Sequence, residues 1–547
     1  MSATNDADAT KSNATAGTEA TDSDGSRYDR AVEQESTPQV AMDQRVNNRT
    51  LSPSAPAFKE FMLEGWGDED KPIEPLESSA YTPARIKALG AKFPGQRLVI
   101  PAGTLKTRNN DCDYRFRPDS AFAYYTGLGE DFEPNAVLVL DPVDPDGPEA
   151  KTGLTHTPTL FVHPRADHTT EDYYRSAAYG EYWIGARPGL RELAQMTGIP
   201  TRDVAELEDA LSKDVGAEAG AVRVRVIDHV DPQVTAIVEE VRQANGFKDP
   251  DANRDGDDGL LEAASTQRMV KDPYEVRELT KAVEATKAGF DRMLAALPAA
   301  VGRPRSERIL EGRFNANARE MGNDEGYGSI VASGPHAATL HWMSNNGTIR
   351  DGELLLIDAG VETNSLYTAD ITRTFPVGGR FTPLQRRLYD AVLEAQYAGF
   401  EAAKPGRTYS DIHHAVMRVL AEHPHEWGIL PVSVEESLSP EGQQHRRWHA
   451  CGCAHHLGLD VHDCAQARFE DYQEAPIRPG YVFTIEPGLY FKENDLLVPP
   501  EYRGIGLRIE DDVLMTEDGP KWLSKPLIPS APDDVEAWMA AQAARTE

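Results

Sequence analysis

The stretch GELLLIDAGVETNSLYTADITRTFPV, residues 352–377, contains two apolar runs that are separated by a polar turn. Such runs predict two buried strands joined as a hairpin, here centred on Asn364. Asp358 ends the first run and Asp370 lies on the second strand, so we expect their carboxylates to lie opposite each other. Two like charges in apolar surroundings are unfavourable unless they are protonated, paired or neutralised by a cation. The alternative is an ordinary hairpin in which one aspartate caps the turn and the other is solvated.

Two further carboxylates fall in apolar strands. Glu486 follows the apolar run of GYVFTIEPGLYF (480–491), and Glu510 lies within GIGLRIEDDVLM (504–515). Arg508 lies two residues before Glu510 and therefore on the same face of the strand, where it can hold one carboxylate in place. One arginine cannot neutralise four acids, so the set still requires a counter-charge.

Three histidines fall within AHHLGLDVHDC, residues 454–464. One imidazole would complete the four carboxylates as ligands for two divalent ions, and we assign His455 to this role. Such an oxygen-dominated set favours Mn²⁺, with Co²⁺, Fe²⁺ or Zn²⁺ as alternatives, and the ion pair would generate a hydroxide nucleophile. Gly458 allows the chain to bend, so His462 can reach the site from another side, whereas His456 is expected to pack in the interior.

Two other metal-binding patterns are weaker. A zinc site within WHACGCAHH (448–456) would use His449, Cys451, Cys453 and His455. Its CxC spacing lacks the usual two-residue gap. Residues 251–262 fit the spacing of a calcium-binding loop, but Asp258 stands where an apolar residue is usual. A segment this rich in Asp, Asn and Gly matches short patterns by chance, so a solvated acidic linker is the preferred interpretation.

The composition disfavours several classes of partner. The chain has 56 Lys and Arg against 89 Asp and Glu, a formal net charge of −33, which disfavours nucleic acid and anionic membranes. Four cysteines in 547 residues do not make a disulfide framework. No apolar run has the roughly 18 to 20 residues of a membrane helix. We therefore expect a cytoplasmic protein.

The order of apolar and polar segments predicts two folded domains. Residues 1–78 are rich in Ala, Thr, Ser and Asp and are expected to be a disordered acidic extension. Residues 79–247 alternate helix and strand patterns and predict an α/β domain. A polar linker at 248–265 precedes a larger domain at 266–530 that alternates helices with strands of antiparallel type, and residues 531–547 form a tail.

Five motifs in the larger domain resemble those of the pita-bread metallopeptidases, and specifically of the Xaa-Pro aminopeptidase (aminopeptidase P) family. They are LIDAG, ADITRTFPVGGRFT, HHLGLDVHD, IEPGLYF and YRGIGLRIEDDVL, in the family's order over residues 268–530. RNNDCDYRFRPDSAFAYYTGL (108–128) also resembles the accessory domain of that family. The resemblance implies an α/β accessory domain followed by an α+β catalytic domain of the creatinase/aminopeptidase-like pita-bread type, with a curved, mainly antiparallel sheet.

The resemblance also implies roles for individual residues. The implied metal ligands are Asp358, Asp370, His455, Glu486 and Glu510. Glu486 would in addition take a proton from the bridging water and pass it to the leaving amine. His341 and His462 would contact the substrate backbone and the developing oxyanion, with His336 as a less well placed alternative to His341. Tyr490 is a further expected substrate contact.

The implied activity is that of a dinuclear-metal aminopeptidase. It would hydrolyse the bond between an N-terminal residue and a penultimate proline by means of a metal-bridging hydroxide. The resemblance further implies a homo-oligomer, either a dimer or a tetramer. Prolidase, which cleaves Xaa-Pro dipeptides, shares the ligand set and is the first alternative. A non-catalytic pita-bread module that binds peptides or proteins is the second.

The sequence departs from the family pattern at three places. The interval between Asp358 and Asp370 is one residue longer, so we expect a bulge or a wider turn to restore the register. The segment between His449 and His455 is longer than the family's HGxxH pattern. Ala123 stands where an aromatic residue is expected. None of these departures removes an implied ligand.

Overall fold

The computed structural model describes residues 53–67, 73–110, 112–130, 132–148, 150–218 and 220–545. Most of the predicted N-terminal extension, residues 1–52 and 68–72, lies outside the described residues. The chain divides into two compact units, one comprising the chain to Trp66 with Thr107–Asp113 and the other Gly67–Lys106 with Tyr114–Glu547. In the first unit, Pro56–Met62 forms the helix α2, and β2 (Thr107–Asn109) pairs with β3 (Cys112–Asp113).

The second unit begins with a domain that confirms the predicted α/β type. Five strands form one sheet in the order β6-β5-β4-β1-β7. Their bounds are β1 (Gln96–Pro101), β4 (Val137–Pro142), β5 (His156–Val162), β6 (Thr201–Asp203) and β7 (Arg223–Val226). β1 pairs antiparallel with β4 and parallel with β7, so the sheet is mixed.

Helices cover both faces of this sheet because its central strands are apolar on both sides. Leu98 and Ile100 of β1 pack in one apolar cluster with residues of α3 and α4, whereas Val99 packs in another with residues of α8 and α9. The helices of the domain are α3 (Thr82–Gly90), α4 (Ser120–Thr126), α5 (Asp172–Arg175), α6 (Glu181–Ile184), α7 (Leu190–Thr197), α8 (Leu207–Ser212) and α9 (Pro232–Ala244).

The segment that the sequence predicts to be a polar linker is a helix, α10 (Pro250–Gln267). The side chain of Asp249 caps its first turn, and Pro250 occupies the first helical position, where a proline costs no hydrogen bond. Asp257 is buried and accepts hydrogen bonds from both terminal nitrogens of Arg242, at 2.9 and 2.6 Å. The calcium-loop alternative is therefore also wrong in conformation, because residues 251–262 are helical.

The larger domain contains strands that all pair in antiparallel orientation. One sheet has the order β12-β10-β9, a second has the order β13-β16-β17, and two strand pairs, β14-β15 and β11-β8, complete the set. The bounds are β8 (Asp324–Glu325), β9 (Ile330–Ser333), β10 (Leu354–Ala359), β11 (Val361–Glu362), β12 (Ile371–Pro376), β13 (Val482–Ile485), β14 (Gly488–Phe491), β15 (Ile505–Arg508), β16 (Asp511–Thr516) and β17 (Gly519–Trp522). The predicted mainly antiparallel α+β domain is confirmed.

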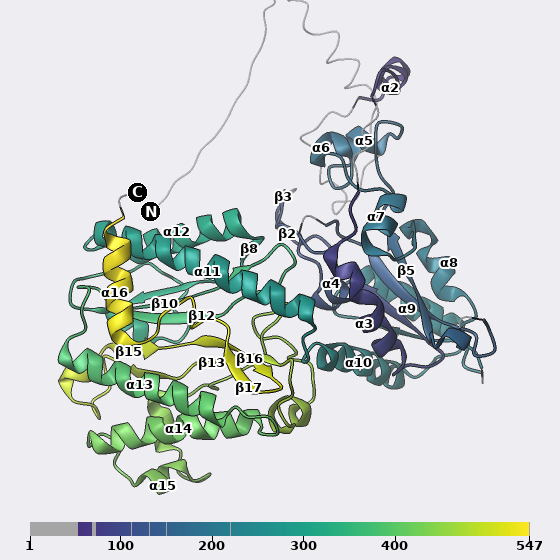
Figure 1. The fold of residues 1–547 in the computed structure, drawn as a ribbon. Helices are drawn as coiled ribbons and strands as arrows, with labels where there is room; N and C mark the ends of the chain where they lie inside the picture. The colour runs from purple at the N-terminus through teal and green to yellow at the C-terminus, as the bar shows by residue number, and fades with distance from the viewer. Residues whose placement is uncertain are drawn as a thin grey trace, which may run out of the picture. The chain divides into compact units, whose positions relative to one another are not determined.

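Two layers of helices enclose these strands. α11 (Pro273–Ala300) and α12 (Ser306–Met321) share an apolar cluster with β9, β10 and β12. α13 (Pro383–Ala402) and α14 (Tyr409–Glu426) share another with β13 to β16, and the short α15 (Val434–Leu438) contacts α14. Figure 1 shows the strands between the two helix pairs.

The predicted C-terminal tail also forms a helix, α16 (Pro532–Ala543). Trp538 on this helix packs against Phe290 and Phe375, with ring centroids 6.2 and 5.6 Å apart. Its indole N–H donates to Asp291 at 2.7 Å. The helix is therefore part of the core of the larger domain.

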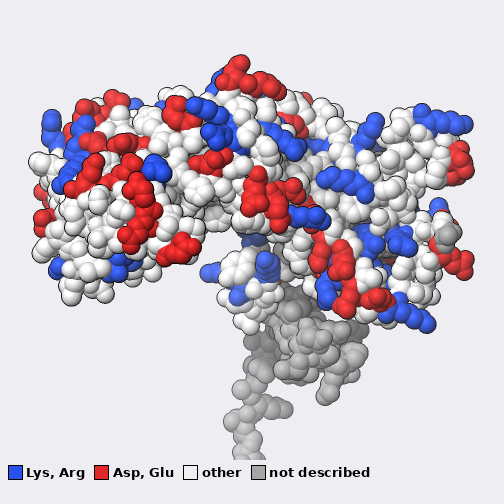
Figure 2. All heavy atoms as spheres, turned by 90° about the horizontal axis from the view of Figure 1, so that it is seen from below, with Lys and Arg blue, Asp and Glu red and all other residues white. Residues whose placement is uncertain are grey.

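None of the described helices combines the length and the apolar character needed to cross a membrane. Figure 2 shows Asp and Glu side chains interleaved with Lys and Arg over much of the face that it presents. Charges of both signs are thus spread over this face although the chain carries a net charge of −33.

Candidate active site

The carboxylates singled out from the sequence lie on neighbouring strands. Asp358 on β10 pairs with Thr372 on β12, and Thr372 forms an isolated bridge with Glu510. β13 and β16 pair Ile485 with Asp511, which brings Glu486, the residue after the end of β13, beside Glu510. Directly paired residues point to the same face of a sheet, so these acidic side chains lie in a row across the strands.

The hairpin centre predicted from the sequence is wrong by one residue. Asp358 pairs with Thr372, not with Asp370, and the amide of Thr363 donates to the carbonyl of Tyr367 at 2.8 Å, so the hairpin centres on Ser365. The residue opposite Asp358 is therefore two positions further along the chain than predicted. A shift of two residues keeps both aspartates on the same face of the sheet, where they are diagonal neighbours. The register is unbroken from Leu354↔Pro376 to the bridge Glu362↔Thr368, so the turn and not a bulge accommodates the longer interval.

Gly360 is required between the two aspartate positions. A Cβ atom at this residue would lie 1.7 Å from the carbonyl oxygen of Ala369 on the opposite strand. The close approach of the strands therefore excludes every side chain here. Glycine is therefore required for steric reasons at this position of the motif LIDAG.

Tyr327 links the two aspartates and was missed by sequence reasoning. Its hydroxyl lies 2.6 Å from Oδ1 of Asp358 and 2.5 Å from Oδ1 of Asp370. A phenol has one proton, so it can donate to only one carboxylate at a time, and the second contact needs a proton from that carboxyl group. Burial and the two nearby charges raise the pKa of Tyr327 well above its usual value.

Arg508, on β15, donates to the row of acids at Asp358. It also donates to the hydroxyl of Tyr490 at 2.8 Å and to Oγ1 of Thr372 at 3.1 Å. Thr372 in turn donates to Glu510 at 2.7 Å. Arg508 is only 3% exposed, so its charge acts in surroundings of low polarity. Tyr490, the expected substrate contact, is buried beside it.

His455 faces the carboxylates through one defined nitrogen. Nδ1 donates to the carbonyl of His456 at 3.0 Å, which leaves Nε2 on the side of the acids. Nε2 lies 3.4 Å from Asp370, 3.6 Å from Glu486 and 3.9 Å from Glu510. Ligand atoms of Asp370, His455 and Glu510 all lie within 4.8 Å of one another, a spacing that can hold a metal ion.

The acids perturb one another strongly. Burial raises the pKa of Glu486 to about 7, although the charges of His455 and Arg508 oppose the increase. Burial and neighbouring carboxylates also raise the pKa of Asp358 and, well above its usual value, that of Glu510. Burial acts to lower the pKa of His455, but the hydrogen bond to Asp370 and the charge of Glu486 outweigh it and raise the value to about 9. Oxygen donors crowded in this way, with one imidazole, fit divalent cations.

The other histidines fall into two groups. His462 lies against His455 with ring centroids 4.6 Å apart, and burial together with the charges of His455 and His341 lowers its pKa. His336, the alternative to His341, is instead bound to Glu307 through Nδ1 at 2.8 Å. His456 is fully buried, as predicted, and contacts the rings of Tyr409, Tyr472 and Tyr481.

The weaker zinc pattern does not assemble as a four-ligand site. Nε2 of His449 lies 3.5 Å from the sulfurs of Cys451 and Cys453, but His455 is turned to the carboxylates. Burial raises the pKa of Cys451 to about 11 and that of Cys453 well above its usual value, so both are neutral thiols at pH 7.

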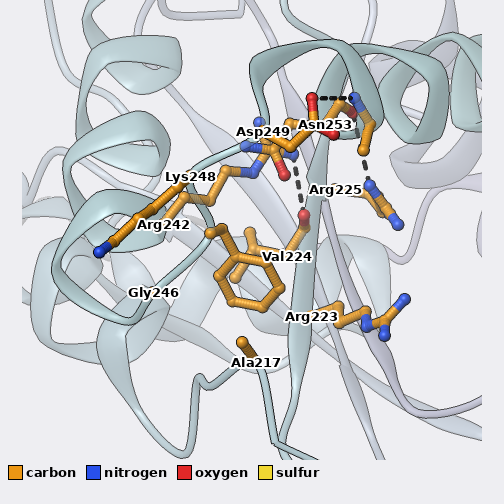
Figure 3. A pocket seen from close by; sticks show the side chains of 11 residues that line it. Ala217, Arg223, Val224, Arg225, Arg242, Gly246, Lys248, Asp249 and Asn253 are labelled. Atoms are coloured by element: carbon orange, nitrogen blue, oxygen red, sulfur yellow. Dashed lines mark hydrogen bonds between the residues drawn. The ribbon is translucent and has the colours of Figure 1, made fainter.

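A separate cavity of about 270 Å³ lies in the N-terminal domain, between β7, α9 and the start of α10. Figure 3 shows Arg242 reaching the carbonyl of Val224 and Arg225 reaching Asn253 along its wall. None of the five acid and imidazole groups described above lines this cavity. The carboxylate cluster and the cavity are therefore distinct places.

The sequence matches known protein families over both of its domains. A family model for "Metallopeptidase family M24" matches residues 277–517, and one for "Aminopeptidase P, N-terminal domain" matches residues 83–222. The chain is 46% identical over 483 residues to Xaa-Pro aminopeptidase 1 of Streptomyces coelicolor, which covers 88% of this chain and 91% of that protein. It is 44% identical over 500 residues to Xaa-Pro aminopeptidase 2 of the same organism, covering 91% and 99%.

The fold agrees with these relatives. The structure of Escherichia coli aminopeptidase P with the inhibitor Pro-Leu aligns with a TM-score of 0.71 and 30% sequence identity, over 86% of this chain and 100% of that chain. The expected combination of accessory domain and pita-bread metallopeptidase domain is confirmed. The chain is therefore a metal-dependent hydrolase that belongs to the aminopeptidase P family of the M24 metallopeptidases.

Proposed function

We propose that this chain is an Xaa-Pro aminopeptidase, which removes the N-terminal residue from peptides that have proline in second position. The observation that carries the proposal is the convergence of Asp370, His455 and Glu510 in one buried cluster, with Asp358 and Glu486 beside them. The relatives named Xaa-Pro aminopeptidase support the substrate class.

We propose two divalent ions, preferentially Mn²⁺, as the cofactors. Their ligands would be Asp358, Asp370, His455, Glu486 and Glu510. The donor set is rich in carboxylate oxygen, which suits Mn²⁺ better than softer ions. When bound, such ions polarise the scissile carbonyl and lower the pKa of a water molecule, which supplies a nucleophile at neutral pH. The raised pKa values of Glu486 and Asp358 support the need for cations at this place.

The residues around the cluster supply proton transfer and orientation. Glu486, whose pKa of about 7 lies near the working pH of a base, would take the proton of the attacking water and give it to the leaving amine. His341 and His462 would hydrogen-bond the substrate backbone and the developing oxyanion, worth about 2–4 kcal/mol in the transition state. Tyr490 is proposed to contact the substrate through its ring, because its hydroxyl already accepts a hydrogen bond from Arg508.

Proline in second position suits such a site. The bond to proline is a tertiary amide without an N–H group, so a peptidase that relies on gripping that N–H cannot use the substrate. A cluster of acids can hold the free α-amine of the first residue instead, which positions the preceding carbonyl for attack.

Substrate comparison tests the proposal. The purified protein, loaded with Mn²⁺, is expected to release the first residue from an Xaa-Pro-Xaa-Xaa tetrapeptide and to leave the matched Xaa-Ala-Xaa-Xaa peptide largely uncut. Cleavage of Xaa-Pro dipeptides alone would identify a prolidase. Binding of the tetrapeptide without cleavage, in protein shown by elemental analysis to contain metal, would identify a non-catalytic peptide-binding module.

Three further expectations belong to the proposal. The domains would span residues 79–247 and 266–530, which the family matches at 83–222 and 277–517 support.

The native protein would be a dimer or a tetramer, which light scattering coupled to gel filtration can measure. A cytoplasmic location is supported by Cys451, Cys453 and Cys464, which are free thiols among the described residues.

A further inference from the structure

A single buried carboxylate, that of Glu307, binds both ends of the loop that follows β9. Oε1 accepts hydrogen bonds from the amide of Ser333 at 2.9 Å and from Nδ1 of His336 at 2.8 Å. Oε2 accepts from the indole of Trp342 at 2.9 Å and from the amide of Gly347 at 2.6 Å. Three donors from the loop and one from the last residue of β9, Ser333, therefore converge on one side chain.

The loop, residues 334–347, carries His341, the proposed oxyanion contact. His341 is itself exposed, and its neighbour Trp342 stacks on His336 with ring centroids 3.9 Å apart. Glu307 is 0% exposed and holds both of these rings. The position of His341 is thus set from both of its sides, through His336 upstream and Trp342 downstream.

The environment of Glu307 is specialised for this contact. It lies in the first turn of α12, where the helix dipole favours a negative charge, and no Lys or Arg of the described chain lies within ion-pair distance of it. A Cβ atom at Gly347 would lie 2.6 Å from its Oε1, so the loop passes directly over the carboxylate. The buried carboxylate is therefore satisfied by the amide of Ser333 at the end of β9, by the three loop donors and by the dipole of helix α12.

We propose that Glu307 is a positioning residue, which fixes loop 334–347 so that His341 faces the carboxylate cluster. The inference rests on the proposed function, because it assigns to Glu307 an effect exerted through His341. It goes beyond the ligand set, since Glu307 reaches the reacting atoms only through the loop.

The variant Glu307→Gln tests the proposal because it keeps the size of the side chain but replaces one acceptor oxygen by a donor. Two of the four N–H donors then face an NH₂ group. We expect kcat/KM for an Xaa-Pro-Xaa-Xaa peptide to fall about 10- to 100-fold, with the loss mainly in kcat, as for a displaced catalytic group. His341→Ala is made in parallel, together with the double variant. Glu320→Gln, at the far end of the same helix and exposed, is the matched control with unchanged kinetics.

The double variant separates positioning from general stability. If Glu307 acts through His341, then Glu307→Gln causes no further loss in the His341→Ala background. An equal loss in both backgrounds, or wild-type kinetics in Glu307→Gln, overturns the proposal. Wild-type kinetics in His341→Ala would instead refute the role given to His341 and, with it, the positioning role of Glu307. Cleavage before proline by the parent protein would not be affected by that result.

A milder variant keeps the test usable if Glu307→Gln does not fold. Trp342→Phe removes one of the four donors and retains a ring over His336. We expect a smaller loss of kcat/KM, about 3- to 10-fold for one hydrogen bond, and again none in the His341→Ala background. A loss of equal size in both backgrounds would contradict the positioning role.

Discussion

At the scale of single residues, the hydroxyl of Tyr327 links the carboxylates of Asp358 and Asp370. Burial and the two carboxylates raise the pKa of Tyr327 well above its usual value, so the phenol stays protonated and continues to donate. Tyr327→Phe removes this donor. We expect the affinity for Mn²⁺ to fall about 10- to 100-fold, the usual cost of losing a hydrogen-bonding partner of a metal ligand. Calorimetric titration of metal-free protein with Mn²⁺ measures the change.

Tyr182→Phe is the control for this prediction, because Tyr182 is 65% exposed and lies in the N-terminal domain. It should bind Mn²⁺ as the parent protein does. Equal affinities in Tyr327→Phe and Tyr182→Phe would show that the hydroxyl does not support the ligands.

The same residues show what a sequence can reveal about a site. Asp358, Asp370, Glu486 and Glu510 could be predicted because an acid inside an apolar strand is costly and therefore informative. Tyr327 could not, since a tyrosine shortly before β9 has no spacing that distinguishes it from a core residue. The hairpin centre was wrong by one residue because Asp358 and Asp370 were expected to lie directly opposite each other, whereas the register depends on how the turn closes.

At the scale of elements, α10 depends on one buried ion pair. Asp257 and Arg242 are 5% and 2% exposed in their side chains and are joined by two hydrogen bonds. In Asp257→Ala the guanidinium of Arg242 stays buried but loses its two hydrogen bonds to the carboxylate of Asp257. We expect the free energy of unfolding to fall by about 3–5 kcal/mol, the range for breaking a buried pair. Urea denaturation followed by circular dichroism gives the value.

Asp251→Ala provides the comparison on the same helix. Asp251 pairs with Arg254, but its side chain is 81% exposed, and an exposed pair contributes about 1 kcal/mol or less. If both variants lost the same stability, the ion pair of Asp257 would not be what holds α10 in place.

Two elements were not recognised from the sequence for a common physical reason. The segment of α10 is rich in Asp, Asn and Gly, residues of low helix propensity, and α16 lies in a segment treated as a tail. Both helices depend on tertiary contacts, namely the ion pair of Asp257 and the packing of Trp538 on Phe290. Local sequence patterns do not reveal such contacts. The strands of both domains could be predicted because their apolar residues form a local pattern.

At the scale of the whole molecule, Arg117 of the N-terminal domain contacts two segments of the candidate active site. It donates to Glu362, on the hairpin of the two aspartates, at 2.7 Å, and to the carbonyl of Leu459, between His455 and His462, at 2.7 Å. We expect Arg117→Met to lower the free energy of unfolding by up to about 3 kcal/mol, the lower end for a buried pair because Arg117 is 33% exposed. Guanidinium denaturation measures this loss.

Arg202→Met is the matched change at the surface of the N-terminal domain. Arg202 and Glu206 are 46% and 49% exposed in their side chains, so we expect a loss of at most about 1 kcal/mol. A loss in Arg117→Met no larger than this would exclude a stabilising role for the contact.

Asp463 makes the free energy of unfolding depend on pH in the acid range. Burial acts to raise its pKa, but the charges of Lys271 and Arg268 outweigh burial and hold the pKa at about 2. The folded value lies below the unfolded value of about 3.9, so this aspartate adds about 2–3 kcal/mol above pH 4. That contribution is lost as the pH falls from about 4 to 2. Unfolding free energies at pH 5, 4 and 3 should therefore fall less steeply in Asp463→Asn than in the parent protein. Parallel curves would contradict this assignment.

The two hydrogen bonds of Arg117 have a practical consequence for anyone who divides this polypeptide. A fragment that starts at α11 would encode every acid and imidazole of the cluster, yet it would expose Glu362 and the Leu459 carbonyl to water in place of a guanidinium. The loops that they brace would then sample other arrangements. We therefore expect such a fragment to be less active than the intact polypeptide, so minimal fragments chosen by ligand content alone would be poor starting points for engineering.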